Sequence, residues 1–278
     1  MNTNVTVIIP IKELKDQSEK DYFANAIASI KEQEVLPEKI LLVIPKGSPL
    51  KEEFNNYEFD ENVKELISVE ENDGETDFCS QINFGVSKVE TEFFSVLEFD
   101  DIYSSIWFKN FEVYKEHYKD VDVFLPLVVD VSTPTESDPQ GRFLHFSNEP
   151  VWAKDFSDRI GFLDNDSLLN YPNFQIDGAI INKESFESVG GLKPGIVMYF
   201  NYELLLRMTY YDMKIMTIPK VGYKKVNMRP GALFWSYQND EKLKLDPTEA
   251  RFWYNTARKE SYFKIDRGIK YEKTTENS

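Results

Sequence analysis

Apolar runs alternate with amphipathic stretches along the first hundred residues. Residues 5–11, VTVIIPI, are almost wholly apolar, which is typical of a strand that is buried on both faces of a sheet. In residues 21–33, by contrast, Phe23, Ile27 and Ile30 recur at helical spacing. The alternation continues with strands at 39–45, 66–69 and 93–99 and a helix at 79–89. Strands that alternate with helices predict an α/β protein with a mainly parallel sheet flanked by helices.

The composition limits the class of protein. The chain has 278 residues, 41% of them hydrophobic, so it can bury a full core as one large domain, alone or with an appendage. No apolar stretch approaches the roughly 20 residues that cross a bilayer, and residues 1–10 lack the features of a secretory signal. The single cysteine, Cys79, cannot form an internal disulfide, and two histidines disfavour a zinc site. We therefore expect a cytoplasmic protein with no transmembrane segment.

The charge balance disfavours nucleic acid as a partner. Forty-eight acidic residues against 32 basic ones give a net charge of −16, which repels polyanions unless positive charge gathers in one cleft. Basic residues do cluster late in the chain, in YKK at 223–225 and at Arg229. This cluster predicts either a local cationic site or, as is more common, a solvated face.

An apolar run ends in three carboxylates within SVLEFDDIY, residues 95–103. In parallel sheets ligands bind beyond the carboxyl ends of the strands, where Glu98, Asp100 and Asp101 fall. Carboxylates there can hold a divalent cation, Mn²⁺ or Mg²⁺, which beside a nucleotide neutralises phosphate oxygens. Alternatively, Asp100 and Asp101 only terminate the strand and cap the next helix. The spacing supports both interpretations equally.

Several segments occur in a characteristic order: VTVIIP, AIASIKEQEVLPEKILLV, QINFGV and VLEFDD, then SFESVGGLKP, NYELLLR and VNMRPGAL. This order, over about residues 3–235, resembles that of family 2 glycosyltransferases. The resemblance implies the GT-A fold, with a mainly parallel, Rossmann-like central sheet flanked by helices. It places one catalytic domain at residues 1–240, with a nucleotide-sugar-binding half at about 1–120 and an acceptor half at about 121–240, before a C-terminal appendage at 241–278.

The resemblance also implies an activity, the transfer of a sugar from a nucleotide-sugar donor to an acceptor. Pro10 and Asn83, the latter in QINFGV, fall on donor-binding positions. The acceptor, whether a glycan, a protein or another molecule, is not identified by the sequence. A nucleotidyltransferase is disfavoured, because Pro10 and the next residues do not form the glycine-rich, basic phosphate loop that such an enzyme needs after its first strand.

Three departures from the family pattern concern the donor site. The family's Asp-x-Asp metal motif is here Glu98-Phe99-Asp100, followed by Asp101, so metal binding is expected in a weakened form. Lys46 stands where the family usually has an acidic residue that contacts the base, which puts uridine in doubt. Arg229 aligns with a frequent metal-binding histidine and could hold a diphosphate directly.

The position of the catalytic base also departs from the family. The acidic pair that begins the family's catalytic helix aligns with Phe200 and Asn201, and an asparagine cannot usefully accept a proton. Glu203 lies two residues further on, where it would face another side of the helix. Asp177, in QIDGAI, is the other candidate base. Inversion and retention at the anomeric carbon therefore both stay open.

These changes fit two kinds of protein. One is an active transferase that relies less on a metal ion, with Arg229 and Lys46 stabilising the departing diphosphate. The other is a decayed site that binds nucleotide or glycan without turnover. Because stabilising the leaving group is the larger catalytic requirement and the base the smaller one, the enzyme is favoured.

The acceptor half begins with residues 121–131, VDVFLPLVVDV, which predict a pair of central strands or one long strand. The polar residues 132–141 predict a loop that either covers the acceptor cleft or is a plain surface loop. Trp152 is a candidate for stacking on the acceptor sugar, with core packing as the alternative.

The C-terminal segment has an amphipathic pattern after Asp246 and Pro247, with one helical face formed by Phe252, Thr256, Lys259 and Phe263. Such a helix could close over the donor site, form a homo-oligomer, lie on a membrane or pack on the catalytic domain. Packing is favoured, because acidic and basic residues are mixed along the helix and leave no clean cationic face for lipid.

Overall fold

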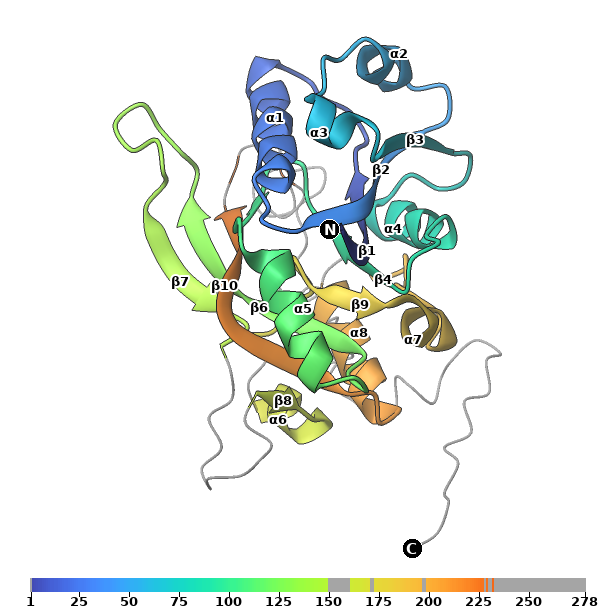
Figure 1. Ribbon diagram of the computed structural model, residues 1–278, viewed down its shortest axis with the longest axis vertical. Helices are drawn as coiled ribbons and strands as arrows, with labels where there is room; N and C mark the ends of the chain where they lie inside the picture. The colour runs from blue at the N-terminus through green and yellow to red at the C-terminus, as the bar shows by residue number, and fades with distance from the viewer. Residues whose placement is uncertain are drawn as a thin grey trace, which may run out of the picture.

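The computed structural model describes residues 2–149, 161–170, 173–196 and 199–227, together with Arg229 and Ala232. Within these residues one sheet forms the centre of the molecule (Figure 1). Its strands are β1 (Asn2–Pro10), β2 (Leu36–Pro45), β3 (Ile67–Asn72), β4 (Phe93–Val96), β5 (Ile102–Tyr103), β6 (Val123–Ser132), β7 (Phe143–Ser147), β8 (Phe162–Leu163), β9 (Ile180–Asn182) and β10 (Ile215–Asn227).

The strands lie in the order β3-β2-β1-β4-β9-β6-β10-β5, while β7 pairs with β6 and β8 pairs with β10. Six of them, β1, β2, β3, β4, β6 and β10, run in one direction, and the short strands β5, β7, β8 and β9 run against them. The carboxyl ends of the six parallel strands therefore meet at one edge of the sheet, which we call the carboxyl edge. Strand β9 begins at this edge, because it runs in the opposite direction.

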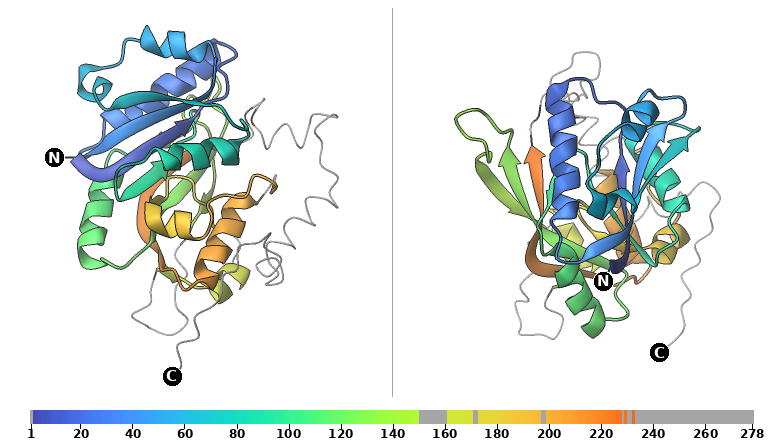
Figure 2. Two further views of the ribbon diagram at one scale, coloured as in Figure 1. Left: turned by 90° about the vertical axis from the view of Figure 1, so that its right-hand side faces the viewer. Right: turned by 45° about the horizontal axis from the view of Figure 1, so that its top comes forward.

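Helices cover both faces of the sheet (Figures 1 and 2). Strand β1 shows why: Ile8 packs into one apolar core, whereas its neighbours Val7 and Ile9 pack into the other. One core is completed by α4, α6, α7 and α8, and the other by α1, α2, α3 and α5. The helices are α1 (Gln17–Lys31), α2 (Leu50–Asn55), α3 (Glu61–Lys64), α4 (Phe78–Ser87), α5 (Trp107–His117), α6 (Asn165–Asn170), α7 (Lys183–Ser188) and α8 (Phe200–Tyr210).

The predicted fold class is confirmed: the protein is a mixed α/β structure with a mainly parallel central sheet. Every strand and helix predicted in the first hundred residues is present, with bounds that shift by a few residues. The predicted segment 121–131 forms one long strand, β6, from Val123 onward rather than a pair, and residues 133–141 of the predicted loop lie in the connection from β6 to β7, while Ser132 ends β6. Trp152 and the segment 241–278 lie outside the described residues.

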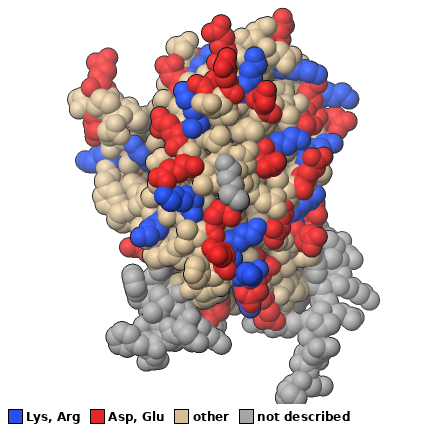
Figure 3. Space-filling model, in the orientation of Figure 1, with Lys and Arg blue, Asp and Glu red and all other residues tan. Residues whose placement is uncertain are grey.

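On the face seen in Figure 3, acidic and basic side chains are interspersed over the described part of the chain, and neither charge forms a separate patch there. Among the described residues, no helix has the length and apolar character to cross a membrane.

An open hollow of about 680 Å³ lies at the edge of the sheet opposite to the carboxyl edge, where it is lined by the amino ends of β1, β2 and β3.

Candidate active site at the carboxyl edge of the sheet

Glu98, Asp100 and Asp101 follow β4 and lie at the carboxyl edge. Strand β10 fixes the segment that carries them: the backbone N–H of Val226 donates to Asp101 Oδ1 at 2.8 Å, and the backbone N–H of Glu98 donates to the Tyr223 hydroxyl at 3.2 Å. Asp100 and Asp101 keep only 9% and 2% of their surface exposed. These carboxylates therefore lie in a largely desolvated place, where charge requires a partner.

Lys225, in β10, and Arg229, in the segment after β10, supply positive charge beside these carboxylates. Lys225 Nζ forms an ion pair with Asp177 Oδ2 and donates to Gln175 Oε1 at 3.3 Å. Arg229 Nε donates to Asp100 Oδ2 at 2.7 Å. We call Glu98, Asp100, Asp101, Asp177, Lys225 and Arg229 the edge cluster.

The Arg229 guanidinium is held on several sides. Its Nη1 donates to Glu19 Oε1 at 3.0 Å, and the other carboxylate oxygen of Glu19 accepts from the backbone N–H of Lys15 at 2.6 Å. The guanidinium also lies 5.1 Å from the centroid of the Phe99 ring and 5.8 Å from that of Tyr22. These contacts fasten the segment after β10 to the start of α1.

Asp177 reaches the edge cluster through a turn that requires glycine. The next residue, Gly178, has φ of +68°, and a Cβ there would lie 2.4 Å from Tyr223 Cδ2. Trp107 Nε1 donates to the carbonyl oxygen of Gly178 at 2.9 Å and fixes the turn from the other side. The backbone before β9 thus lies directly against β10, and Asp177 meets Lys225.

The edge cluster holds more acid than base. Burial raises the pKa of Glu98 to about 8; Lys225 and Arg229 act against this shift, and Asp177 and Asp100 add to it. Burial also raises the pKa of Asp101 well above its usual range, with Asp100 and Glu98 contributing. For Lys225, burial alone would lower the pKa, but Asp177, Glu98 and Asp101 outweigh burial and raise it. The lysine therefore stays charged, while Glu98 holds a proton below about pH 8.

The shift of Glu98 predicts a pH-dependent stability. Between its ordinary pKa of 4.5 and its folded value of about 8, the folded chain binds a proton that the unfolded chain releases. The stabilisation is complete below pH 4.5 and is lost as the pH rises through 8. Glu98→Gln removes this dependence, so its melting temperature relative to wild type should rise between about pH 5 and pH 9. Thermal melts at several pH values test this, and a difference that stays constant with pH would contradict it.

The aspartates expected to hold a divalent cation already accept hydrogen bonds from the chain. Asp100 Oδ2 accepts from Arg229, and Asp101 Oδ1 accepts from the backbone of Val226. Over the described residues, no three side chains of His, Cys, Asp or Glu are arranged to hold a metal ion. In this arrangement the edge cluster does not form a metal site, and a metal ion at Asp100 and Asp101 would have to compete with the donors that already engage one oxygen of each.

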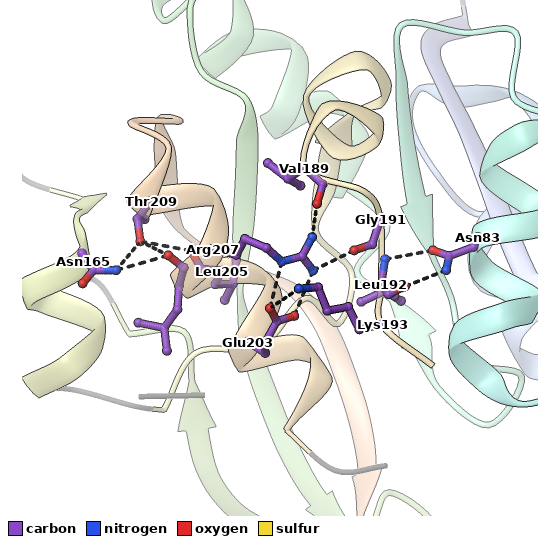
Figure 4. Close-up of polar contacts among 11 residues, drawn as sticks. Asn83, Asn165, Val189, Gly191, Leu192, Lys193, Glu203, Leu205, Arg207 and Thr209 are labelled. Atoms are coloured by element: carbon purple, nitrogen blue, oxygen red, sulfur yellow. Dashed lines mark hydrogen bonds and ion pairs between the residues drawn. The ribbon is translucent and has the colours of Figure 1, made fainter. Parts of the chain in front are cut away.

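The other predicted donor-binding residues fall in two places. Pro10 ends β1, and Lys46 directly follows β2, so both lie at the carboxyl edge. Lys46 Nζ is 3.7 Å from Asp73 Oδ2, and its side chain is 69% exposed. Asn83 is different: its Nδ2 donates to the carbonyl oxygen of Leu192 at 2.7 Å, and its Oδ1 accepts from the Leu192 N–H at 2.9 Å (Figure 4). The Asn83 amide thus holds the turn after α7.

The two candidates on α8 differ in environment. Glu203 is completely buried, and its two oxygens accept from Arg207 Nε and Nη2 at 2.8 and 2.9 Å (Figure 4). Lys193 Nζ lies 3.9 Å from the same carboxylate. Because both oxygens of Glu203 are engaged and none of its surface is exposed, an acceptor cannot reach it. Asn201 Oδ1 is buried and has no hydrogen-bond partner among the described residues.

Two residues of this site, Lys225 and Glu19, are not predicted by the sequence. Lys225 lies in the YKK stretch, for which a solvated face is the simplest interpretation, and Glu19 is one of many acidic residues. Alternation along a strand was the available signal for Lys225, because residues two apart share a face and Tyr223 is fully buried. Nothing local in the sequence indicated that Glu19 meets Arg229 across 210 positions.

The fold is that of known glycosyltransferases. S. aureus TarS 1-349 in complex with UDP-GlcNAc matches with a TM-score of 0.61 and 14% identity, over 85% of this chain and 61% of that chain. TarS 1-349 without that ligand matches with a TM-score of 0.60 and 12% identity, over 93% and 80%. GalNAc-T7 with UDP, GalNAc and Mn²⁺ matches with a TM-score of 0.59 and 13% identity, over 91% and 48%. The chain thus spans about three fifths of the first of these structures.

No protein-family profile and no curated protein matches the sequence. At identities of 12–14%, the structural likeness establishes the GT-A fold and nothing finer. The expected fold is thereby confirmed.

Proposed function

We propose that this protein is a glycosyltransferase of family 2 type that moves a sugar from a nucleotide-sugar donor to an acceptor. The observation that carries the proposal is the edge cluster: buried carboxylates and two cations meet at the carboxyl edge of a GT-A sheet. Ligands of open α/β sheets bind at this edge. The UDP-GlcNAc complex of TarS, a protein of the same fold, supports a nucleotide sugar as the donor.

The residues of the edge cluster can divide the chemistry between them. In the reaction, the bond between the anomeric carbon and the diphosphate oxygen breaks, and its electron pair stays on the diphosphate. The acceptor oxygen forms the new bond to that carbon and loses its proton to a base. Lys225 would stabilise the diphosphate while Arg229 holds Asp100, and Asp177, the base expected from the sequence, would take the proton; its ion pair with Lys225 supports this assignment.

A donor panel tests the proposed function. Purified protein is incubated with UDP-GlcNAc, UDP-GalNAc, UDP-glucose, GDP-mannose and dTDP-rhamnose, and the release of free nucleoside diphosphate is followed. At least one donor should be hydrolysed slowly even without an acceptor, and Asp100→Ala should reduce that release. Intact donors throughout the panel, with and without added Mn²⁺, would contradict the proposal.

A second function has its own supporting observation. The family's base position is occupied by Asn201, and Glu203 is engaged with Arg207, so α8 presents no available carboxylate at its start. A protein that binds nucleotide or glycan without turnover would show this pattern. In that case a nucleotide sugar would raise the melting temperature without being consumed, and Asp100→Ala would change affinity alone.

A further inference from the structure

We propose that Lys225 binds the donor diphosphate in the place of a divalent metal ion, while Arg229 serves as the fixed counter-ion of Asp100. The identity of the ligand rests on the proposed function, but the mode of binding rests on the contacts at the carboxyl edge. The proposal replaces the expected metal site with a pair of cations built into the chain.

Asp100 and Asp101 already have hydrogen-bond partners from the chain itself. For a metal ion to bind Asp100 and Asp101, it would have to compete with the Arg229 guanidinium and the Val226 N–H. Asp100 and Arg229 are 9% and 7% exposed, so breaking their contact would leave a buried guanidinium with one carboxylate partner fewer. The chain itself therefore already supplies positive charge to Asp100.

The two cations, Arg229 and Lys225, differ in how firmly the chain holds them. Arg229 is bound by Asp100 and Glu19 and lies close to the rings of Phe99 and Tyr22, and its side chain is 8% exposed. An arginine held in this way fixes the position of Asp100, but it cannot turn toward a ligand without breaking these contacts. Its hydrogen bond with Glu19 links the edge cluster to α1.

The side chain of Lys225 is more exposed than that of Arg229, so Lys225 is the cation of the pair that a ligand can reach. Its side chain keeps 22% of its surface exposed, whereas that of its partner Asp177 keeps 5%. An ammonium group has three donors, and Lys225 directs them toward two described partners, Asp177 and Gln175. Its ion pair with Asp177 keeps it charged, since Asp177 is the strongest of the contributions that raise the pKa of Lys225 despite burial. A diphosphate entering the carboxyl edge would thus meet a positioned ammonium group.

The neighbouring lysine provides a matched control. Lys224 pairs with Ile102 in the sheet, and its Nζ donates to the carbonyl oxygen of Gln140 at 2.8 Å. Because side chains alternate along a strand, Lys224 points to the opposite face from Lys225. Replacing either lysine by methionine removes the same charge from adjacent positions of β10.

The test is calorimetric titration of the full chain with UDP, GDP, ADP and dTDP, in buffer with EDTA and in buffer with MnCl₂. We expect at least one diphosphate to bind wild type with affinities in the two buffers that agree within about threefold. Lys225→Met should weaken this binding by about 10- to 100-fold, the effect of losing a charge-assisted hydrogen bond. Lys225→Arg should retain part of the affinity, and Lys224→Met should bind as wild type does.

The outcomes separate this inference from the proposed function. Binding or donor turnover that requires Mn²⁺ and survives Lys225→Met overturns the inference and leaves the function standing. Binding that depends on Lys225 without turnover of any donor supports the inference and overturns the function. If no diphosphate binds in either buffer, both are overturned.

Discussion

Replacing Arg207 with methionine is expected to lower the free energy of unfolding by about 3–5 kcal/mol. Arg207 and Glu203 form a completely buried pair on α8, with 1% and 0% of their surface exposed. Arg207 also donates to the carbonyl oxygens of Val189 and Gly191, in the turn after α7 (Figure 4). Methionine would leave the Glu203 charge without its main partner and would free the turn. Urea denaturation of both proteins measures the difference.

Two further variants show whether burial is the cause. Lys20→Met breaks an ion pair with Glu53 whose side chains are 43% and 45% exposed, so it should cost at most about 1 kcal/mol. Adding Glu203→Leu to Arg207→Met removes the stranded charge and should restore part of the lost stability. An Arg207→Met protein as stable as wild type would show that this pair does not hold α8 against the turn.

Replacing Asp177 with asparagine is expected to lower kcat by about 10²- to 10⁴-fold, the usual contribution of a general base. Asparagine has the same shape and keeps an oxygen that can accept from Lys225, but it cannot accept the proton of the acceptor. The affinity for the nucleoside diphosphate should therefore change far less than the rate. Initial rates with the best donor and a saturating acceptor, together with titration by the diphosphate, separate the two quantities.

The control makes the same chemical change in an ion pair at the other edge of the sheet. Glu92 directly precedes β4, and its carboxylate accepts from Lys115 Nζ at 2.8 Å with about half of its side chain exposed. Glu92→Gln should leave kcat unchanged. If Asp177→Asn retains full turnover, another group takes the proton, or the reaction needs no base from the protein.

The sequence predicted β1, β2, β4 and β6 well because these strands are mostly buried, whereas the 13-residue strand β10, which is partly exposed along its length, was not predicted. Residues such as Val7, Ile8 and Ile9 face two different cores, so apolar side chains follow one another without a polar break. Short strands that run against the sheet carry a weaker signal. Strand β9 has three residues and β5 has two, and neither was predicted, because pairing with neighbours rather than periodicity defines them.

The site was predicted only in part. The position of Glu98, Asp100 and Asp101 follows from the strand that precedes them, so local pattern sufficed to place them at the carboxyl edge. Their partners could not be found in this way, since Arg229 is 129 positions away from Asp100 and Lys225 is 48 positions from Asp177. The i, i+4 spacing of Glu203 and Arg207 is compatible with an ion pair on one helix, but this spacing does not show that the pair is buried.

The most direct test of the central claim is a crystal structure of the protein with a bound nucleoside diphosphate. The account predicts that the diphosphate lies at the carboxyl edge, within hydrogen-bonding distance of Lys225 Nζ, with Arg229 still on Asp100. A diphosphate bound instead in the hollow at the amino ends of the strands, beside Thr6 and Ser68, would contradict it.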